Sequence, residues 1–122
     1  NTARSMIFTT ALPPFNVAWT HFIFNQIETF KPLRDNLVVL SKAFGDGIKI
    51  PQQSHIVPYV LGENEKAVEC STYLHEHGFL VLPIRHPTVP IGTARLRFSL
   101  SANLTTEIIY KVTDLLNAFE KK

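Results

Sequence analysis

The chain has 122 residues, of which 45% are hydrophobic, and its 12 basic and 10 acidic side chains leave a formal net charge of +2. This length suits one globular domain, and charges so evenly balanced and interspersed predict neither a nucleic-acid surface nor a polybasic membrane segment. No apolar run approaches the length that spans a bilayer, and a single cysteine, Cys70, excludes an internal disulfide, so we expect a cytoplasmic protein.

Hydrophobic spacing in the first part of the chain predicts two helices that form a bent arm. The first helix is expected to begin after Pro13 and Pro14, to carry apolar residues at steps of three and four, and to end at Pro32. The second takes Pro32 into its first turn and keeps the same spacing until Gly45 and Gly47 break it. The apolar residues of the first helix are Phe15, Trp19, Phe22, Ile23, Ile27 and Phe30.

Capping residues indicate two further helices. The third is expected to begin at Asn64, whose side chain can accept hydrogen bonds from the first free amides, and to stop at Gly78. The fourth has Thr105 as its cap, and Leu104 is placed to pack on Ile109 as a hydrophobic staple. The expected inward positions are Ala67, Cys70 and Leu74 on the third helix and Ile109, Val112, Leu116 and Phe119 on the fourth.

Three strands are predicted between these helices, at residues 55–61, 79–82 and 94–100. The last of them alternates apolar and polar residues, so one of its faces should lie in the core. Pro58 cannot donate to a strand ladder, which indicates an edge strand. The order strand, helix, strand, strand, helix predicts an α+β fold. We expect a three-stranded, mainly antiparallel split βαβ sheet, with the third strand between the first two and helices packed on one face.

Residues that often carry chemistry form no constellation in this sequence. His75 and His77 are two positions apart on a helix, so they point to different faces and predict no metal site. His21 and His55 have no neighbours at ligand spacing, and Cys70 lies on the apolar side of its helix, as is typical of a packed thiol. A phosphate-binding glycine loop and a nucleophile elbow are both missing. We therefore assign no catalytic residue and no metal ligand.

A proline-rich loop presents two candidate binding residues, Arg85 and Thr88. The stretch 82–102 reads LPIRHPTVPIGTARLRFSLSA, and its three prolines predict a stiff, non-helical loop that leads into a strand. A stiff loop would present Arg85 to a carboxylate at a small cost in entropy. A surface arginine in an ordinary turn fits the loop equally well. The hydroxyl pair Thr9 and Thr10 would bond an anion or simply end a strand.

Three separated motifs resemble the α-oxoamine synthases: FTTALPP at 8–14, GENEKA at 62–67 and IRHPTVPIGTARLRFSLSA at 84–102. They occur in the family's order and at suitable distances, and the match covers essentially the whole chain. The resemblance implies a fold-type I enzyme that depends on pyridoxal phosphate and works as a homodimer. Within the family, the chain is most similar to the acyltransferase that condenses L-alanine with pimeloyl-CoA or a pimeloyl-carrier protein and releases CO₂ in biotin synthesis.

The same resemblance implies roles for four residues. Arg85 would hold the carboxylate of the amino-acid substrate, and Thr88 would contact that substrate. Thr9 and Thr10 would reach the phosphate of the pyridoxal phosphate in the partner subunit. The family's Schiff-base lysine lies a short way upstream of FTTALPP and has no match here. The isolated chain is therefore expected to be a C-terminal portion that is inactive alone, and its opening on Asn1 instead of Met fits this expectation.

The implied layout has residues 1–13 as the last strand segment of a large domain, 14–47 as a connecting helical arm and 48–122 as the C-terminal small domain. Two positions depart from the family pattern without removing an implied functional group: His86 replaces a proline of the motif IRPPTVP, and Leu104 stands where a histidine is common. The alternatives are another α-oxoamine synthase, such as a glycine C-acetyltransferase or a long-chain type, or a non-catalytic module that binds a small acid or a partner protein. We expect no nucleic-acid or membrane partner.

Overall fold

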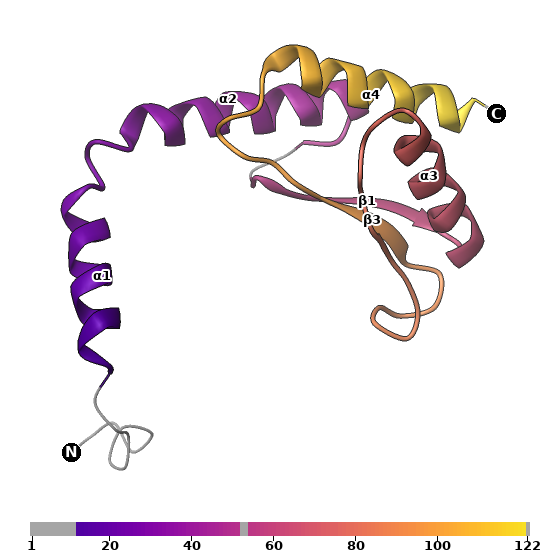
Figure 1. Ribbon diagram of the computed structural model, residues 1–122. Coiled ribbons are helices and arrows are strands. Elements are labelled where there is room, and N and C mark those ends of the chain that lie inside the picture. Colours follow the sequence, from indigo (N-terminus) through magenta and orange to yellow (C-terminus); the bar gives the residue numbers. More distant parts are fainter. Residues whose placement is uncertain (1–11, 52–53, 122) are drawn as a thin grey trace. The chain divides into compact units, whose positions relative to one another are not determined.

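The computed structural model describes residues 12–51 and 54–121, which form two compact units divided between Pro32 and Leu33. In the described ranges the elements follow one another along the chain as shown in Figure 1. They are α1 (Pro14–Asn25), α2 (Lys31–Ile48), β1 (Ile56–Gly62), α3 (Asn64–Glu76), β2 (Pro83–Ile84), β3 (Ala94–Ser99) and α4 (Thr106–Glu120). Among these helices none has the length and apolar character needed to cross a membrane.

The three strands form one antiparallel sheet in the order β1, β3, β2. Val57 of β1 lies opposite Phe98 of β3, and Ile84 of β2 lies opposite Arg95 of β3. The predicted α+β class and the predicted position of the last strand between the other two are both confirmed. Pro58 lies on β1, which is an edge strand of the sheet, as predicted. A proline is tolerated on an edge strand because one side of that strand has no hydrogen-bonding neighbour.

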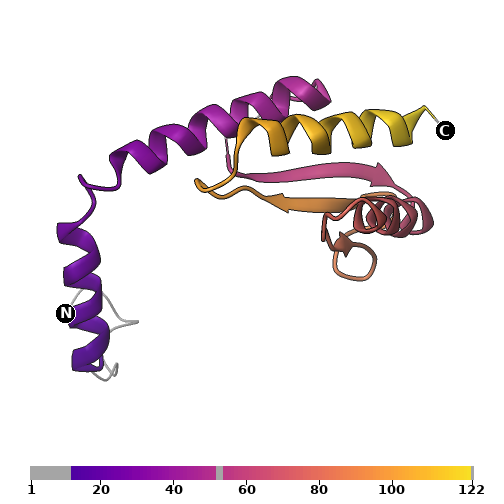
Figure 2. The same cartoon turned by 45° about the horizontal axis from the view of Figure 1, so that its top comes forward.

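One face of the sheet carries the hydrophobic core, and helices cover it. Figure 2 shows α2 and α4 side by side over this face. The predicted alternation of β3 is confirmed, because Ala94, Leu96 and Phe98 are buried whereas Arg97 and Ser99 are exposed. The core consists of Leu40, Phe44, Ile48, Val57, Tyr59, Cys70, Leu74, Leu96, Phe98, Leu100, Ile109, Val112 and Leu116. All the predicted inward positions of α3 are buried, and of those of α4 only Phe119 remains partly exposed.

The prediction that Gly45 and Gly47 end the second helix was wrong, because α2 continues through both to Ile48. A Cβ built on Gly47 would lie only 2.7 Å from the Cβ of Thr113. Gly47 thus permits a close approach between α2 and α4. The helix ends at Ile48, and the next residue, Lys49, adopts a φ of 58°. A glycine in a sequence can end a helix or allow two helices to pack closely, and hydrophobic spacing alone does not distinguish the two.

The prediction of a strand at residues 79–82 was also wrong. The second strand is the short pair Pro83–Ile84, which bonds to β3. Phe79 and Val81 are partly buried against the core, whereas Leu80 is 77% exposed and Leu82 is 69% exposed. This alternation of burial imitates a strand, but the segment does not join the ladder.

The first helix is shorter than predicted, ending at Asn25 instead of Pro32. The next backbone bonds are turn-like, with Gln26 N–H donating to the carbonyl of Ile23 at 3.0 Å and Ile27 N–H to that of Phe24 at 3.2 Å. None of the residues of α1 is buried, so this helix lacks the packing that would extend it. Residues 1–11, which make up most of the expected strand segment 1–13, lie outside the described residues.

Candidate functional site

Arg85 directly follows β2 and opens a tight turn that ends at Thr88. The N–H of Thr88 donates to the carbonyl of Arg85 at 2.9 Å, the N–H of Val89 donates to the same oxygen at 3.4 Å, and the peptide bond between His86 and Pro87 is cis. The predicted non-helical loop is confirmed. One turn carries the side chains of both Arg85 and Thr88, and both residues are exposed. Thr9 and Thr10 lie outside the described residues.

A second turn connects this loop to β3. The backbone N–H of Thr93 donates to the carbonyl of Pro90 at 3.2 Å, and its hydroxyl donates to the same oxygen at 2.7 Å. The Nε of Arg95, in β3, donates to the carbonyl of Thr93 at 2.9 Å. The loop is thus bonded internally at both ends, which limits the conformations available to the residues it carries.

The turn at Arg85 lies beside the first turns of α3, and together they line an open surface hollow of about 620 Å³. Its lining consists of Asn64, Glu65, Val68, Glu69, Arg85, His86 and Pro87. Within the described part of the chain, the guanidinium of Arg85 has neither an ion-pair partner nor a side-chain hydrogen bond. An unpaired arginine at the edge of a polar hollow can bind a carboxylate through two parallel hydrogen bonds.

Asn64 does not cap α3 as predicted. The N-cap position is Glu63, and no side chain caps the helix there. The Oδ1 of Asn64 instead accepts a hydrogen bond of 3.3 Å from the N–H of His86 in the Arg85 turn. Sequence reasoning missed this contact because the two residues are 22 positions apart and each has a plausible local role.

Two other reactive side chains, Cys70 and His77, do not line the Arg85 hollow. Cys70 is 0% exposed, and burial raises the pKa of its thiol to about 11, so the thiol stays protonated at neutral pH. The predicted packed thiol is confirmed. His77 lies at the end of α3, with its Nδ1 2.7 Å from the carbonyl oxygen of Tyr73. No group of three possible metal ligands gathers among the described residues.

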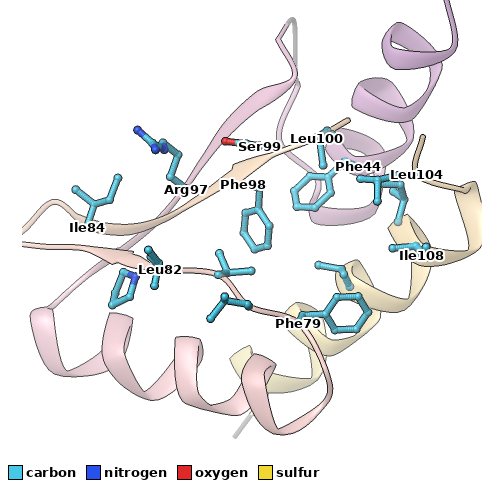
Figure 3. Close-up of a pocket in the computed structure, with 15 residues that line it drawn as sticks. Phe44, Phe79, Leu82, Ile84, Arg97, Phe98, Ser99, Leu100, Leu104 and Ile108 are labelled. Atoms are coloured by element: carbon cyan, nitrogen blue, oxygen red, sulfur yellow. The ribbon is translucent and has the colours of Figure 1, made fainter. Parts of the chain in front are cut away.

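A second, more apolar hollow of about 640 Å³ lies between residues 79–84, β3, α2 and the start of α4. Figure 3 shows Phe98 directed into it and Arg97 directed away on the other side of β3. Since Arg97 is the charged member of the described lining, the hollow lacks a group for acid–base chemistry. The Arg85 hollow is therefore the better candidate for binding a polar substrate.

Comparisons with known proteins agree with this architecture. The profile of the family aminotransferase class I and II matches residues 1–116. An 8-amino-7-oxononanoate synthase from Haemophilus ducreyi is 52% identical over 111 residues, which are 86% of this chain and 29% of that protein. The chain thus spans less than a third of the length of this relative. The resemblance to α-oxoamine synthases inferred from the three motifs is confirmed.

Solved structures show the same fold. The 8-amino-7-oxononanoate synthase from Francisella tularensis is 27% identical with a TM-score of 0.76, covering 98% of this chain and 37% of that one. A serine palmitoyltransferase variant from S. paucimobilis, solved with PLP and myriocin bound, is 29% identical with a TM-score of 0.77, covering 97% of this chain and 32% of that one. The family profile and these relatives together show that the chain belongs to the aminotransferase class I and II family.

Proposed function

We propose that this chain forms the C-terminal small-domain part of a PLP-dependent 8-amino-7-oxononanoate synthase. The whole enzyme would condense L-alanine with a pimeloyl thioester, carried by CoA or a carrier protein, and release CO₂ in biotin synthesis. The observation that carries the proposal is the 52% identity to the Haemophilus ducreyi enzyme of that name. The free guanidinium at the Arg85 hollow supports it independently, because an α-amino acid offers a carboxylate.

In this proposal Arg85 binds the carboxylate of alanine and orients the amino acid. A guanidinium offers two donors in a fixed fork, so it restricts the rotation of the bound carboxylate more than a single ammonium would. The closed turn supports this role, because the N–H groups of Thr88 and Val89 both donate to the carbonyl of Arg85 and so restrain its backbone. Thr88 shares the turn and would contact the same substrate through its hydroxyl.

The described residues do not by themselves fit pyridoxal phosphate. The described lining of the Arg85 hollow contains no lysine to bond the cofactor's aldehyde. The cofactor, when bound, supplies an electron sink for the α-carbon of the amino acid. We assign its main contacts to other parts of the whole enzyme, with Thr9 and Thr10 reaching the phosphate held by the partner subunit of a homodimer.

A second candidate is another α-oxoamine synthase, because the serine palmitoyltransferase from S. paucimobilis has a similar fold, with a TM-score of 0.77. Its identity to this chain is 29%, against 52% for the Haemophilus ducreyi relative. A fold shared within a family does not fix the substrate, whereas higher identity across the same segment favours the alanine enzyme.

A chimera tests the proposal. Residues 1–122 would replace the segment that they match in the Haemophilus ducreyi enzyme, with the unaltered host as the positive control. The proposal predicts ketone formation from L-alanine and pimeloyl-CoA at a rate within about tenfold of the host's. Glycine with acetyl-CoA and L-serine with palmitoyl-CoA should give at most traces. A folded chimera that prefers either of those pairs, or that forms no ketone, would contradict the proposal.

A further inference from the structure

The Arg85 turn has one backbone donor that points out of the turn. The N–H groups of Thr88 and Val89 both donate to the carbonyl of Arg85, which closes the turn internally. The N–H of His86 has no backbone acceptor among the described residues and donates instead to Oδ1 of Asn64 at 3.3 Å. This bond joins the turn to the first residue of α3.

The acceptor lies on a firmly held element. α3 has three inward residues, Ala67, Cys70 and Leu74, each 0% exposed, and they fix the helix against the sheet. The side chain of Asn64 makes no capping bond to its own helix, so its oxygen is available to the turn. A loop residue bonded to a packed helix loses freedom that the rest of its loop retains.

Arg85 gains most from this restraint. Its guanidinium is exposed and has no ion-pair partner in the described part of the chain, so nothing at its far end fixes its direction. What the described structure restrains is the backbone from which the side chain extends, one residue before the N–H that Asn64 holds. Orienting a binding group in advance lowers the entropy lost when the ligand binds.

We propose that Asn64 is a positioning residue for Arg85, and that its hydrogen bond to the His86 N–H sets the affinity of the turn for the carboxylate of the amino-acid substrate. The inference rests on the proposed role of Arg85. It assigns to Asn64, which also lines the Arg85 hollow, a function in substrate binding that acts through the backbone of the turn.

The first test uses the chimera, with each variant checked by a thermal melt, in a buffer with salt near 0.15 M to screen exposed charges. Asn64→Ala removes the acceptor and should raise the KM for alanine about three- to tenfold, with kcat changed less than about twofold. Asn64→Asp keeps an acceptor oxygen and should stay within about threefold of the unaltered chimera. Thr72→Ala, an exposed position on the same helix, is the matched control and should leave KM unchanged.

The second test asks whether Asn64 acts through the His86 N–H. His86→Pro removes this donor, and it restores the residue that the resembling family carries at this position. In the His86→Pro background, Asn64→Ala should change the KM for alanine by less than about twofold, because the bond it would remove is already absent. A side chain that stabilises α3 in some other way would give the same increase in both backgrounds.

The outcomes distinguish failure of the Asn64 role from failure of the Arg85 role. Three outcomes overturn the positioning role. The KM for alanine in Asn64→Ala stays as unchanged as in Thr72→Ala, or it rises equally in Asn64→Asp and Asn64→Ala. The third is an equal rise caused by Asn64→Ala with and without His86→Pro. The role of Arg85 then stands if Arg85→Ala raises the KM for alanine. An Arg85→Ala variant with an unchanged KM overturns the proposed function itself, whatever Asn64 does.

Discussion

The hydroxyl of Tyr59 in β1 donates a hydrogen bond of 2.6 Å to Oε1 of Glu120, the last residue of α4. Tyr59 is 4% exposed, and burial, together with the bond to Glu120, raises the pKa of its hydroxyl above the ordinary range. Tyr59→Phe should therefore lower the free energy of unfolding by about 1–2 kcal/mol, as loss of a partly buried hydrogen bond to a carboxylate does. Urea denaturation of the chain would measure this change.

Tyr110→Phe provides the control for Tyr59, because Tyr110 lies on α4 with 54% of its surface exposed. Its free energy of unfolding should stay within about 0.5 kcal/mol of the unaltered chain. Equal effects of the two substitutions would show that the bond between β1 and α4 contributes nothing to stability.

Gly47→Ala should destabilise the chain although alanine favours helices. The added Cβ would lie 2.7 Å from the Cβ of Thr113, a branched atom next to the backbone of α4, so the helices must separate. Separation also strains the bond of 3.0 Å from Nδ2 of Asn117 to the carbonyl of Gly47. Overpacking of this kind costs about 1–3 kcal/mol, and a thermal melt would detect it.

The neighbouring substitution Asp46→Ala is the control for Gly47, because Asp46 is exposed on the same helix. It should shift the melting temperature only slightly. A Gly47→Ala variant as stable as the unaltered chain would mean that α2 and α4 can separate without cost.

The buried thiol of Cys70 should make the free energy of unfolding decrease at alkaline pH. Burial raises the pKa of its thiol from 9.0 to about 11, so the folded chain holds this proton more tightly than the unfolded chain does. This contribution is fully present below pH 9 and is lost as the pH rises toward 11, by about 2–3 kcal/mol in all. Denaturation curves between pH 8.5 and 10 should show a decline in the unaltered chain that is weaker in Cys70→Ala. Equal slopes in the two proteins would contradict the assignment.

How much of this fold can be predicted from sequence depends on whether the signal is local. The alternation of Leu96 and Phe98 with Arg97, and the capping residue Thr105, are local patterns, and the structure confirms both: Thr105 Oγ1 accepts from the N–H of Ile108 at 3.4 Å. The use of Gly47 is different, since it depends on Thr113, 66 positions away along the chain. Spacing within a segment carries no information on that partner.

The candidate site divides in the same way. The prolines around Arg85 predict its stiff turn from local chemistry alone. The capping preference of asparagine assigned Asn64 as a helix cap, yet its side chain bonds to His86 across 22 positions. The unpaired state of the Arg85 guanidinium depends on where α3 places Glu65 and Glu69, which line the same hollow without forming an ion pair with it, and the residues of the loop do not determine this.

The unit that contains α1 exposes a set of apolar side chains, in which the Trp19 and Phe22 ring centroids are 5.8 Å apart. Their exposed fractions are 75% for Phe15, 56% for Trp19, 53% for Phe22 and 69% for Phe24. Several large exposed apolar side chains on one helix favour association, so the 122-residue chain should self-associate and bind an apolar dye. Sedimentation and dye fluorescence of Phe15→Ser/Phe22→Ser should show less of both, whereas Thr20→Ser should match the unaltered chain. A monodisperse monomer that binds no dye would refute this expectation.

In the chimera, kcat/KM for alanine at saturating pimeloyl-CoA measures whether Arg85 binds the carboxylate of the amino-acid substrate. Arg85→Lys keeps the charge but loses the two-point contact, at a cost of about 1.5–3 kcal/mol, or roughly a ten- to hundredfold fall in kcat/KM. Arg85→Ala should be lower still, with an unchanged melting temperature. If Arg85 is only a solvated loop residue, both variants should stay within about 0.5 kcal/mol of the unaltered chimera. A normal kcat/KM for alanine in a folded Arg85→Ala chimera would contradict the account.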